Sequence, residues 1–230
     1  MRTAVVTGSA RGIGAAVAER LAQSGYQVVG VDRSPHEAGY LARTVVADLG
    51  SAAQCAEVFE QVGHVDALVN NAALLVDRPL EETTVDDMDS LLSVNLRAAM
   101  IMTKLALPGM VERGWGRVVN MSSVGARTGG YASSGVYNTT KAGLISFTKY
   151  VARHYGPHGV TANAVAPGGI RTEMMAHLDD DQLDEYRSLI PVGRLGTPLD
   201  VARAVDFLMA ADSDYINGVT LDVNGGWFMA

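Results

Sequence analysis

The sequence lacks several features that mark particular classes of protein. Its only cysteine, Cys55, cannot form a disulfide within the chain and stands in a pattern typical of the buried face of a helix. The net charge is −7 and no block of basic residues occurs. Nothing in the sequence therefore indicates binding to nucleic acid or to an anionic membrane.

Long apolar runs, leader segments and metal-ligand spacings are also missing. No uncharged apolar run approaches the roughly 20 residues that a membrane span requires, and the first residues lead straight into a predicted strand rather than a signal peptide. His154 and His158 are separated by Gly156 and Pro157, which should end a helix, so we expect no metal site. A length of 230 residues then favours one cytoplasmic domain, residues 1–230.

Short apolar segments alternate with helical patterns along the chain. Strands are expected at residues 3–6, 26–31, 44–47, 65–69, 117–121, 160–165 and 219–223, and the clearest helices at about 51–62, 84–107, 135–155 and 198–211. This alternation predicts an α/β fold with a doubly wound parallel sheet. Ligands of such sheets bind beyond the carboxyl ends of the strands.

Two segments depart from this alternation of strands and helices. Residues 34–43 contain Pro35 and Gly39, so the second crossover helix should be stunted. Residues 173–197 form a long connection, which predicts a small lid at about 173–195. The acidic run at 179–181 is expected to start a helix on a solvated face.

A glycine-rich turn follows the first predicted strand. Its sequence is Thr7-Gly8-Ser9-Ala10-Arg11-Gly12-Ile13-Gly14, and a helical pattern comes directly after it. Glycines let the backbone approach a pyrophosphate closely, and the N–H groups at a helix start supply donors and positive potential. This order of strand, turn and helix predicts a dinucleotide-binding unit.

Asp32 ends the second predicted strand, where a carboxylate can accept hydrogen bonds from an adenosine ribose. The same carboxylate would repel a 2′-phosphate, so NAD is favoured as cofactor. Arg11 and Arg33 argue for NADP, because either could meet a phosphate. NADP therefore stays open as the alternative.

Tyr137 and Lys141 lie four residues apart in the predicted helix 135–155, and so share one face. A phenol has a reference pKa of about 10, and a nearby ammonium or a helix N-terminus favours the phenolate. The pair has the chemistry of a tuned proton donor and acceptor. The pattern is also common on solvated helix faces, so it decides nothing alone. Asn95, in an apolar part of the helix 84–107, needs hydrogen-bond partners, whether structural or functional.

Together these motifs resemble the short-chain dehydrogenase/reductase family over nearly the whole chain. The residues that carry the resemblance are Thr7-Gly8-xxx-Gly12-x-Gly14, Asp48, Asn70-Asn71-Ala72, Asn95, Ser123, Tyr137-xxx-Lys141, Pro167-Gly168-xxx-Thr172 and the ending Asn217 to Gly226. The resemblance implies a seven-stranded sheet of order 3-2-1-4-5-6-7 with helices on both faces. It also implies a homotetramer or homodimer built through the long helices.

The family pattern implies roles for individual residues. Tyr137 would exchange a proton with the substrate oxygen, Lys141 would lower its pKa and bind the nicotinamide ribose, and Ser123 would donate to the substrate oxygen. Asn95 would hold a water that links Lys141 to solvent. Cofactor contacts are expected from Gly8, Arg11, Gly12, Ile13, Gly14, Asp32, Asp48, Leu49, Asn71, Ala72, Tyr137, Lys141, Pro167, Gly168, Ile170 and Thr172.

The chain departs from the family pattern at three places. Ala73 stands where the family has a further glycine, which could crowd the cofactor loop. Ser122 and Ser123 are adjacent, so the assignment of the catalytic serine to Ser123 is not secure. The stunted segment after Asp32 leaves the adenine side more open.

The sequence therefore predicts an oxidoreductase that moves a hydride between NAD(H) and a secondary alcohol or ketone, leaning towards alcohol oxidation. The expected substrate pocket includes Ser123, Tyr131, Tyr137 and Met174 and suits a partly apolar small molecule. One rival is an NAD(H)-binding redox sensor without turnover, which would not need the Ser123, Tyr137 and Lys141 set. An epimerase or dehydratase that retains its nicotinamide would need a larger substrate domain.

Overall fold

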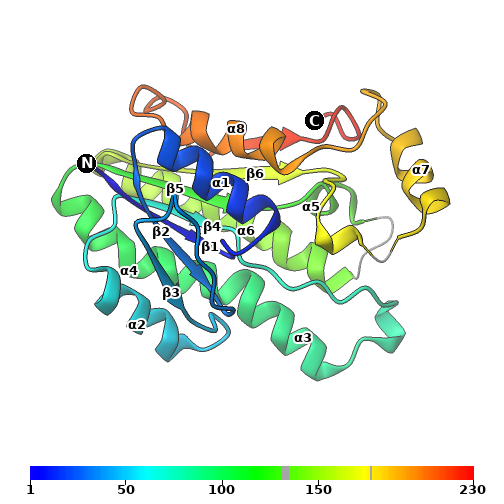
Figure 1. Cartoon of the computed structure of the whole chain (residues 1–230), viewed down its shortest axis with the longest axis horizontal. Helices are drawn as coiled ribbons and strands as arrows, with labels where there is room; N and C mark the ends of the chain where they lie inside the picture. Colours follow the sequence, from blue (N-terminus) through cyan, green and yellow to red (C-terminus); the bar gives the residue numbers. More distant parts are fainter. Residues whose placement is uncertain (131–134, 177) are drawn as a thin grey trace.

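A seven-stranded, fully parallel sheet forms the centre of the protein (Figure 1). The computed structural model describes residues 1–130, 135–176 and 178–230, without the side chain of Met174. The strand order is β3-β2-β1-β4-β5-β6-β7, as the family resemblance implies. The strands are β1 (Thr3–Thr7), β2 (Gln27–Asp32), β3 (Arg43–Val46), β4 (Ala67–Asn70), β5 (Gly116–Met121), β6 (Val160–Pro167) and β7 (Thr220–Val223).

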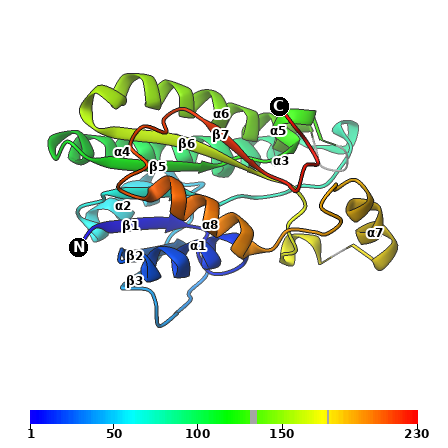
Figure 2. The same ribbon diagram turned by 90° about the horizontal axis from the view of Figure 1, so that it is seen from above.

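Helices cover both faces of the sheet (Figure 2). The helices are α1 (Gly12–Gln23), α2 (Ala52–Val62), α3 (Val85–Leu92), α4 (Ala98–Glu112), α5 (Gly125–Thr128), α6 (Gly135–Tyr155), α7 (Asp180–Ser188) and α8 (Pro198–Met209), with single 3₁₀ turns at Leu80–Glu82, Gly156–His158 and Glu173–Met175. Helices α1 and α8 pack on one face, and α2, α4 and α6 on the other. The predicted doubly wound architecture is confirmed.

The central strands are buried on both faces, which explains why they read as continuous apolar runs. Every residue of β4, β5 and β6 is buried. Cys55 is fully buried in α2 and its thiol donates to the carbonyl of Leu49, as its apolar pattern predicted. This packing fixes the strand ends, from which the loops of the site emerge.

The predicted helix 84–107 is divided into α3 and α4 by a π-helical turn at Ser93–Arg97. Thr84 and Asp87 form a capping box at its start. By length and composition alone, the combined stretch Val85–Glu112 could cross a membrane. In this fold it packs against α2, α6 and the sheet, which is how a core helix behaves.

The two segments that depart from the alternation, residues 34–43 and 173–197, differ in their content of helix. Residues 34–42 contain no helix, so the second crossover is an irregular loop. Beyond Glu173, helix α7 lies apart from the sheet, beside the carboxyl ends of the strands (Figure 2). Asp179 caps α7 and forms a capping box with Gln182, so the acidic run does start a helix.

Candidate active site

One pocket of about 990 Å³ lies along the carboxyl ends of the strands, where the fold class predicts ligands to bind. The predicted site residues that line it are Gly8, Arg11, Gly12, Ile13, Gly14, Asp32, Asp48, Leu49, Asn71, Ala72, Ser123, Tyr137, Lys141, Pro167, Gly168, Ile170 and Thr172. Asn95 does not line this pocket. Tyr131 and the side chain of Met174 were predicted to line the substrate end and lie outside the described part of the chain.

The glycine loop crosses the pocket floor between β1 and α1. Gly8 has φ +67° and Gly12 has φ +57°, which side-chain-bearing residues rarely adopt. A Cβ on Gly14 would lie 2.0 Å from the carbonyl oxygen of Gly8. The loop therefore leaves a backbone-lined hollow at the start of α1, and Arg11 places no side-chain cap on the N–H groups there. This cradle suits a pyrophosphate.

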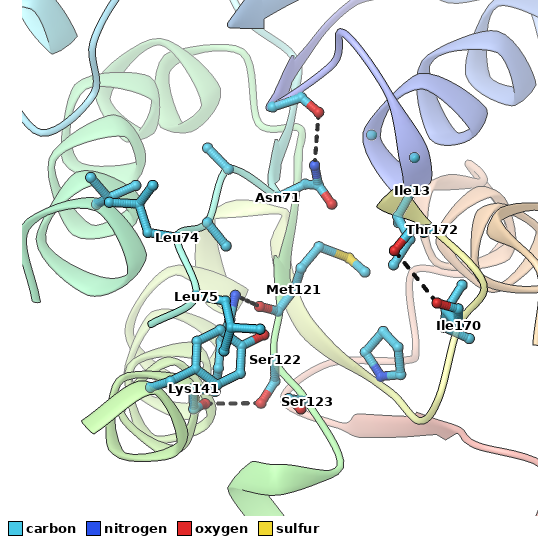
Figure 3. A pocket seen from close by; sticks show the side chains of 18 of the residues that line it. Ile13, Asn71, Leu74, Leu75, Met121, Ser122, Ser123, Lys141, Ile170 and Thr172 are labelled. Carbon is cyan, nitrogen blue, oxygen red and sulfur yellow. Dashed lines mark hydrogen bonds between the residues drawn. The ribbon is translucent and has the colours of Figure 1, made fainter. Parts of the chain in front are cut away.

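Side chains from β1 and the β4 loop hold this cradle together. The side-chain amide of Asn71 donates to the carbonyls of Thr7 (2.9 Å) and Gly8 (3.1 Å) (Figure 3). In return, the hydroxyl of Thr7 accepts from the backbone N–H groups of Asn71 and Ala72. The two loops on this side of the pocket are therefore fixed to each other by hydrogen bonds.

Asn95 sits in the π-helical turn and is almost fully buried. Its side-chain oxygen accepts from the N–H of Leu74 (2.7 Å), and its amide donates to the carbonyl of Leu74 (2.9 Å) and to Thr140 (3.4 Å). These bonds satisfy the amide and position the loop after β4. The structural alternative for Asn95 is therefore realised, and the water-holding role stays a prediction.

The adjacent serines at the end of β5 have different partners. Ser122 is buried and donates to the backbone carbonyl of Lys141 (2.9 Å) (Figure 3). Ser123 accepts from the N–H of Gly125, and its hydroxyl lies close enough to Tyr137 to lower the pKa of that phenol. Of the two, Ser123 is the serine that reaches the tyrosine.

Lys141 is buried, and its ammonium donates to the backbone carbonyl of Met121 (2.7 Å) (Figure 3). Its Nζ lies 5.6 Å from the ring centroid of Tyr137. Burial lowers the pKa of Lys141 to about 8. Burial also raises the pKa of Tyr137 to about 12, although the hydrogen bond with Ser123 acts in the opposite direction.

The tyrosine pKa therefore moves opposite to the direction that the sequence suggested. Burial of the phenol is the main cause, and the ammonium of Lys141 is held at a backbone carbonyl rather than against the hydroxyl. The arrangement keeps a protonated phenol in the pocket wall at neutral pH. Such a group is suited to donate a proton to a developing alkoxide.

The far end of the pocket includes Trp227, a residue that sequence reasoning did not assign. Trp227, from the segment after β7, packs edge-on against Tyr186 of α7 with ring centroids 5.6 Å apart. Leu178 and Asp77 also line this end. The sequence carried no signal for Trp227, because only the fold brings the chain end next to α7.

Comparisons with known proteins agree with this geometry. A family model described as "Enoyl-(Acyl carrier protein) reductase" matches residues 8–228. The chain belongs to the short-chain dehydrogenase/reductase family. It is therefore an oxidoreductase of this family, built on a single Rossmann-type sheet.

Two curated relatives and one solved structure show the range of the similarity. The chain is 38% identical to a 3-oxoacyl-[acyl-carrier-protein] reductase of Aquifex aeolicus, over 99% of this chain and 97% of that one. It is 37% identical to an acetoacetyl-CoA reductase of Cupriavidus necator, over 99% and 98%. A Beutenbergia cavernae structure described as an NAD(P)-dependent gluconate 5-dehydrogenase superposes with a TM-score of 0.94 at 34% identity, covering 98% and 96%.

The predicted preference for NAD is wrong. The Beutenbergia cavernae structure holds NADP, at low occupancy. Part of the physical reason lies at Asp32, whose negative charge is partly offset by the N–H groups of Ala10 (3.1 Å) and Ser34 (3.1 Å) that its carboxylate accepts from. Arg11 and Arg33 are exposed and line the same end of the pocket. The repulsion assigned to Asp32 from sequence ignored these partners.

Proposed function

We propose that this protein is an NADP(H)-dependent reductase of 3-oxoacyl thioesters, which forms the 3-hydroxyacyl product. The observation that carries the proposal is that Ser123, Tyr137 and Lys141 line one pocket together with the glycine cradle. The two curated relatives named above are reductases of this kind by name. Their similarity extends over 99% of the chain.

The proposed mechanism divides the work between cofactor and protein. When bound, NADPH supplies the hydride that adds to the ketone carbon. Ser123 would donate a hydrogen bond to the ketone oxygen, and Tyr137 would deliver its phenolic proton there as negative charge develops. Lys141 would bind the nicotinamide ribose and compensate the tyrosinate left behind. The cradle of Gly8, Gly12, Ile13 and Gly14 would hold the pyrophosphate.

The remaining predicted cofactor contacts are kept as proposals. Asp48 and Leu49 would flank the adenine, and Asn71 and Ala72 the ribose on that side. Pro167, Gly168, Ile170 and Thr172 would enclose the nicotinamide end, where the hydroxyl of Thr172 now donates to the carbonyl of Ile170 (3.5 Å). All of these residues line the pocket.

The substrate end favours an acyl chain over a sugar acid. Apolar side chains line it, namely Leu74, Leu75, Met175, Leu178 and Trp227. Asp77 lies close enough to Tyr186 to help raise the pKa of that phenol, after the larger effect of burial. This apolar lining suits a 3-oxoacyl chain better than a polyhydroxy acid. The lid, residues 173–195, would close over the acyl chain.

Location and assembly follow from the same proposal. We expect a cytoplasmic homotetramer or homodimer that contacts neither nucleic acid nor membrane. Leu92, Met100 and Leu105 are exposed on the α3–α4 stretch, and Tyr150 is exposed on α6. Apolar groups on these two helices support the predicted subunit contacts. Sedimentation measurements would distinguish the two assemblies.

Substrate choice tests the proposed function directly. Nicotinamide absorbance should report rapid reduction of acetoacetyl-CoA by NADPH and little or no oxidation of gluconate by NADP. The expected difference follows from the apolar lining of the substrate end. Faster turnover of gluconate would replace the thioester proposal with the activity named for the structural relative. Tight NADPH binding without turnover of either compound would favour a sensor.

Arg11 tests the phosphate end of the cofactor site. Arg11→Ala should raise the KM for NADPH about tenfold, because one charge-assisted hydrogen bond to the 2′-phosphate is lost. The KM for NADH should stay near the wild-type value, since NADH lacks that phosphate. Arg153→Ala, which removes an exposed arginine far from the pocket on α6, is the matched control. Equal losses for both cofactors would contradict the assignment.

The pH profile of ketone reduction should show a single decline on the alkaline side. Tyr137, with a pKa raised to about 12, keeps its proton throughout the neutral and mildly alkaline range. Lys141, with a pKa lowered to about 8, loses its charge first. We therefore expect kcat/KM to be level at neutral pH and to fall above about pH 8. Lys149→Met, an exposed lysine on the same helix, should leave the decline unchanged.

A further inference from the structure

A hydrogen-bonded clip joins the glycine loop to the loop after β2. The hydroxyl of Ser9 lies 2.9 Å from Nε2 of His36, and Nδ1 of His36 lies 3.2 Å from the carbonyl of Ser34. The carboxylate of Asp32 accepts from the N–H groups of Ala10 and Ser34. We call this set of five residues the adenosine-side clip. It includes no residue of the proposed catalytic set.

The ring of His36 can satisfy both of its contacts in one neutral tautomer. Because the carbonyl of Ser34 can only accept, Nδ1 must carry the proton. Nε2 is then left as an acceptor for the hydroxyl of Ser9, at a distance typical of a good hydrogen bond. His36 therefore links two loops that are 27 residues apart in sequence.

Strand β2, which lies beneath the clip, leaves space for it at Gly30. Gly30 of β2 has no side chain, and a Cβ there would lie 2.6 Å from Oγ of Ser9 and 3.0 Å from Nε2 of His36. Any larger residue at this position would push the two groups off the strand. The half-buried imidazole is thus seated in a space that the backbone provides.

Arg11 and Arg33, the two exposed arginines, stand on the two loops that the clip joins. Arg11 follows Ala10 on one loop, and Arg33 stands between Asp32 and Ser34 on the other. While the loops are joined, Asp32 is held at two backbone N–H groups. These two bonds fix the orientation of its carboxylate and use one acceptor site on each oxygen.

We propose that His36 is a positioning residue for cofactor choice, which favours NADP(H) by holding Asp32 away from the ribose and the two arginines beside the 2′-phosphate. This inference rests on the proposed function, in which NADP(H) is the cofactor. Without the imidazole, the loop after β2 loses its attachment to Ser9. Asp32 then becomes free to accept ribose hydroxyls, as in an NAD site.

The test is the ratio of kcat/KM for NADPH to kcat/KM for NADH, measured with acetoacetyl-CoA. His36→Ala should lower this ratio about tenfold through the KM for NADPH, while kcat at saturating NADPH stays at the wild-type value. His36→Gln, whose amide can still bond Ser9, should restore most of the ratio. Ser34→Ala is the matched control, since Ser34 joins the clip through its backbone groups.

The outcomes separate this inference from the proposed function. A wild-type enzyme that uses NADH better than NADPH would overturn the proposed cofactor and the inference with it. A wild type that prefers NADPH, with an unchanged ratio in His36→Ala, would overturn the inference alone. The inference would also be overturned if His36→Gln lowered the ratio as much as His36→Ala. The hydrogen bond to Ser9 would then not determine the cofactor preference. A lowered ratio in His36→Ala that Gln restores supports it.

Discussion

Tyr137→Phe is expected to lower kcat/KM for acetoacetyl-CoA reduction about a thousandfold. The phenol hydroxyl keeps its proton at neutral pH, so its removal takes away the only proposed proton donor at the ketone oxygen. Steady-state nicotinamide absorbance would measure the loss. The phenyl ring preserves the packing, and NADPH affinity measured by fluorescence titration should stay close to the wild-type value.

Tyr150→Phe is the matched control for this variant. Tyr150 lies on the same helix, α6, and is exposed. It should retain full activity, because its hydroxyl takes no part in the proposed chemistry. If Tyr137→Phe kept activity within about tenfold of the wild type, general acid catalysis by this tyrosine would be excluded.

Gly14→Ala is expected to weaken NADPH binding by about tenfold to a hundredfold. The added methyl group would lie 2.0 Å from the carbonyl oxygen of Gly8 and 2.5 Å from the side-chain amide of Asn71. Both neighbours must shift, so the cradle for the pyrophosphate cannot keep its shape. Isothermal titration with NADPH and a thermal unfolding curve would separate lost binding from lost stability.

Gly39→Ala is the corresponding control. Gly39 has a negative φ, and nothing lies within 4 Å of the position its Cβ would occupy. Both its NADPH affinity and its melting temperature should match the wild type. If Gly14→Ala bound NADPH as tightly as Gly39→Ala did, the cradle would not be the pyrophosphate site.

The sheet and the location of the pocket could be predicted because their signals are local. Buried parallel strands read as short apolar runs, and the glycine loop, Asn71 and Ser123 follow directly at strand ends. The order of the strands came from the family resemblance. A stunted crossover helix was expected at 34–43, because Pro35 and Gly39 disfavour a regular helix, but residues 34–42 contain no helix at all.

The parts that could not be predicted depend on contacts between distant segments. The partners of Asp32 lie on another loop and in its own turn, so its carboxylate appeared free in the sequence. The pKa of Tyr137 depends on burial and on where the lysine ammonium is held, which no spacing reveals. The π-helical turn that aims Asn95 at Leu74 has no sequence signature of its own.

The central claim is that NADPH-dependent reduction of a 3-oxoacyl thioester occurs in this pocket. The most direct test is the kcat/KM of the wild-type enzyme for NADPH and for NADH, measured in parallel with saturating acetoacetyl-CoA. We expect turnover with NADPH at least about tenfold more efficient than with NADH, equivalent to one net phosphate contact. Preferred use of NADH, or no reduction of acetoacetyl-CoA by a folded enzyme that binds NADPH, would contradict the account.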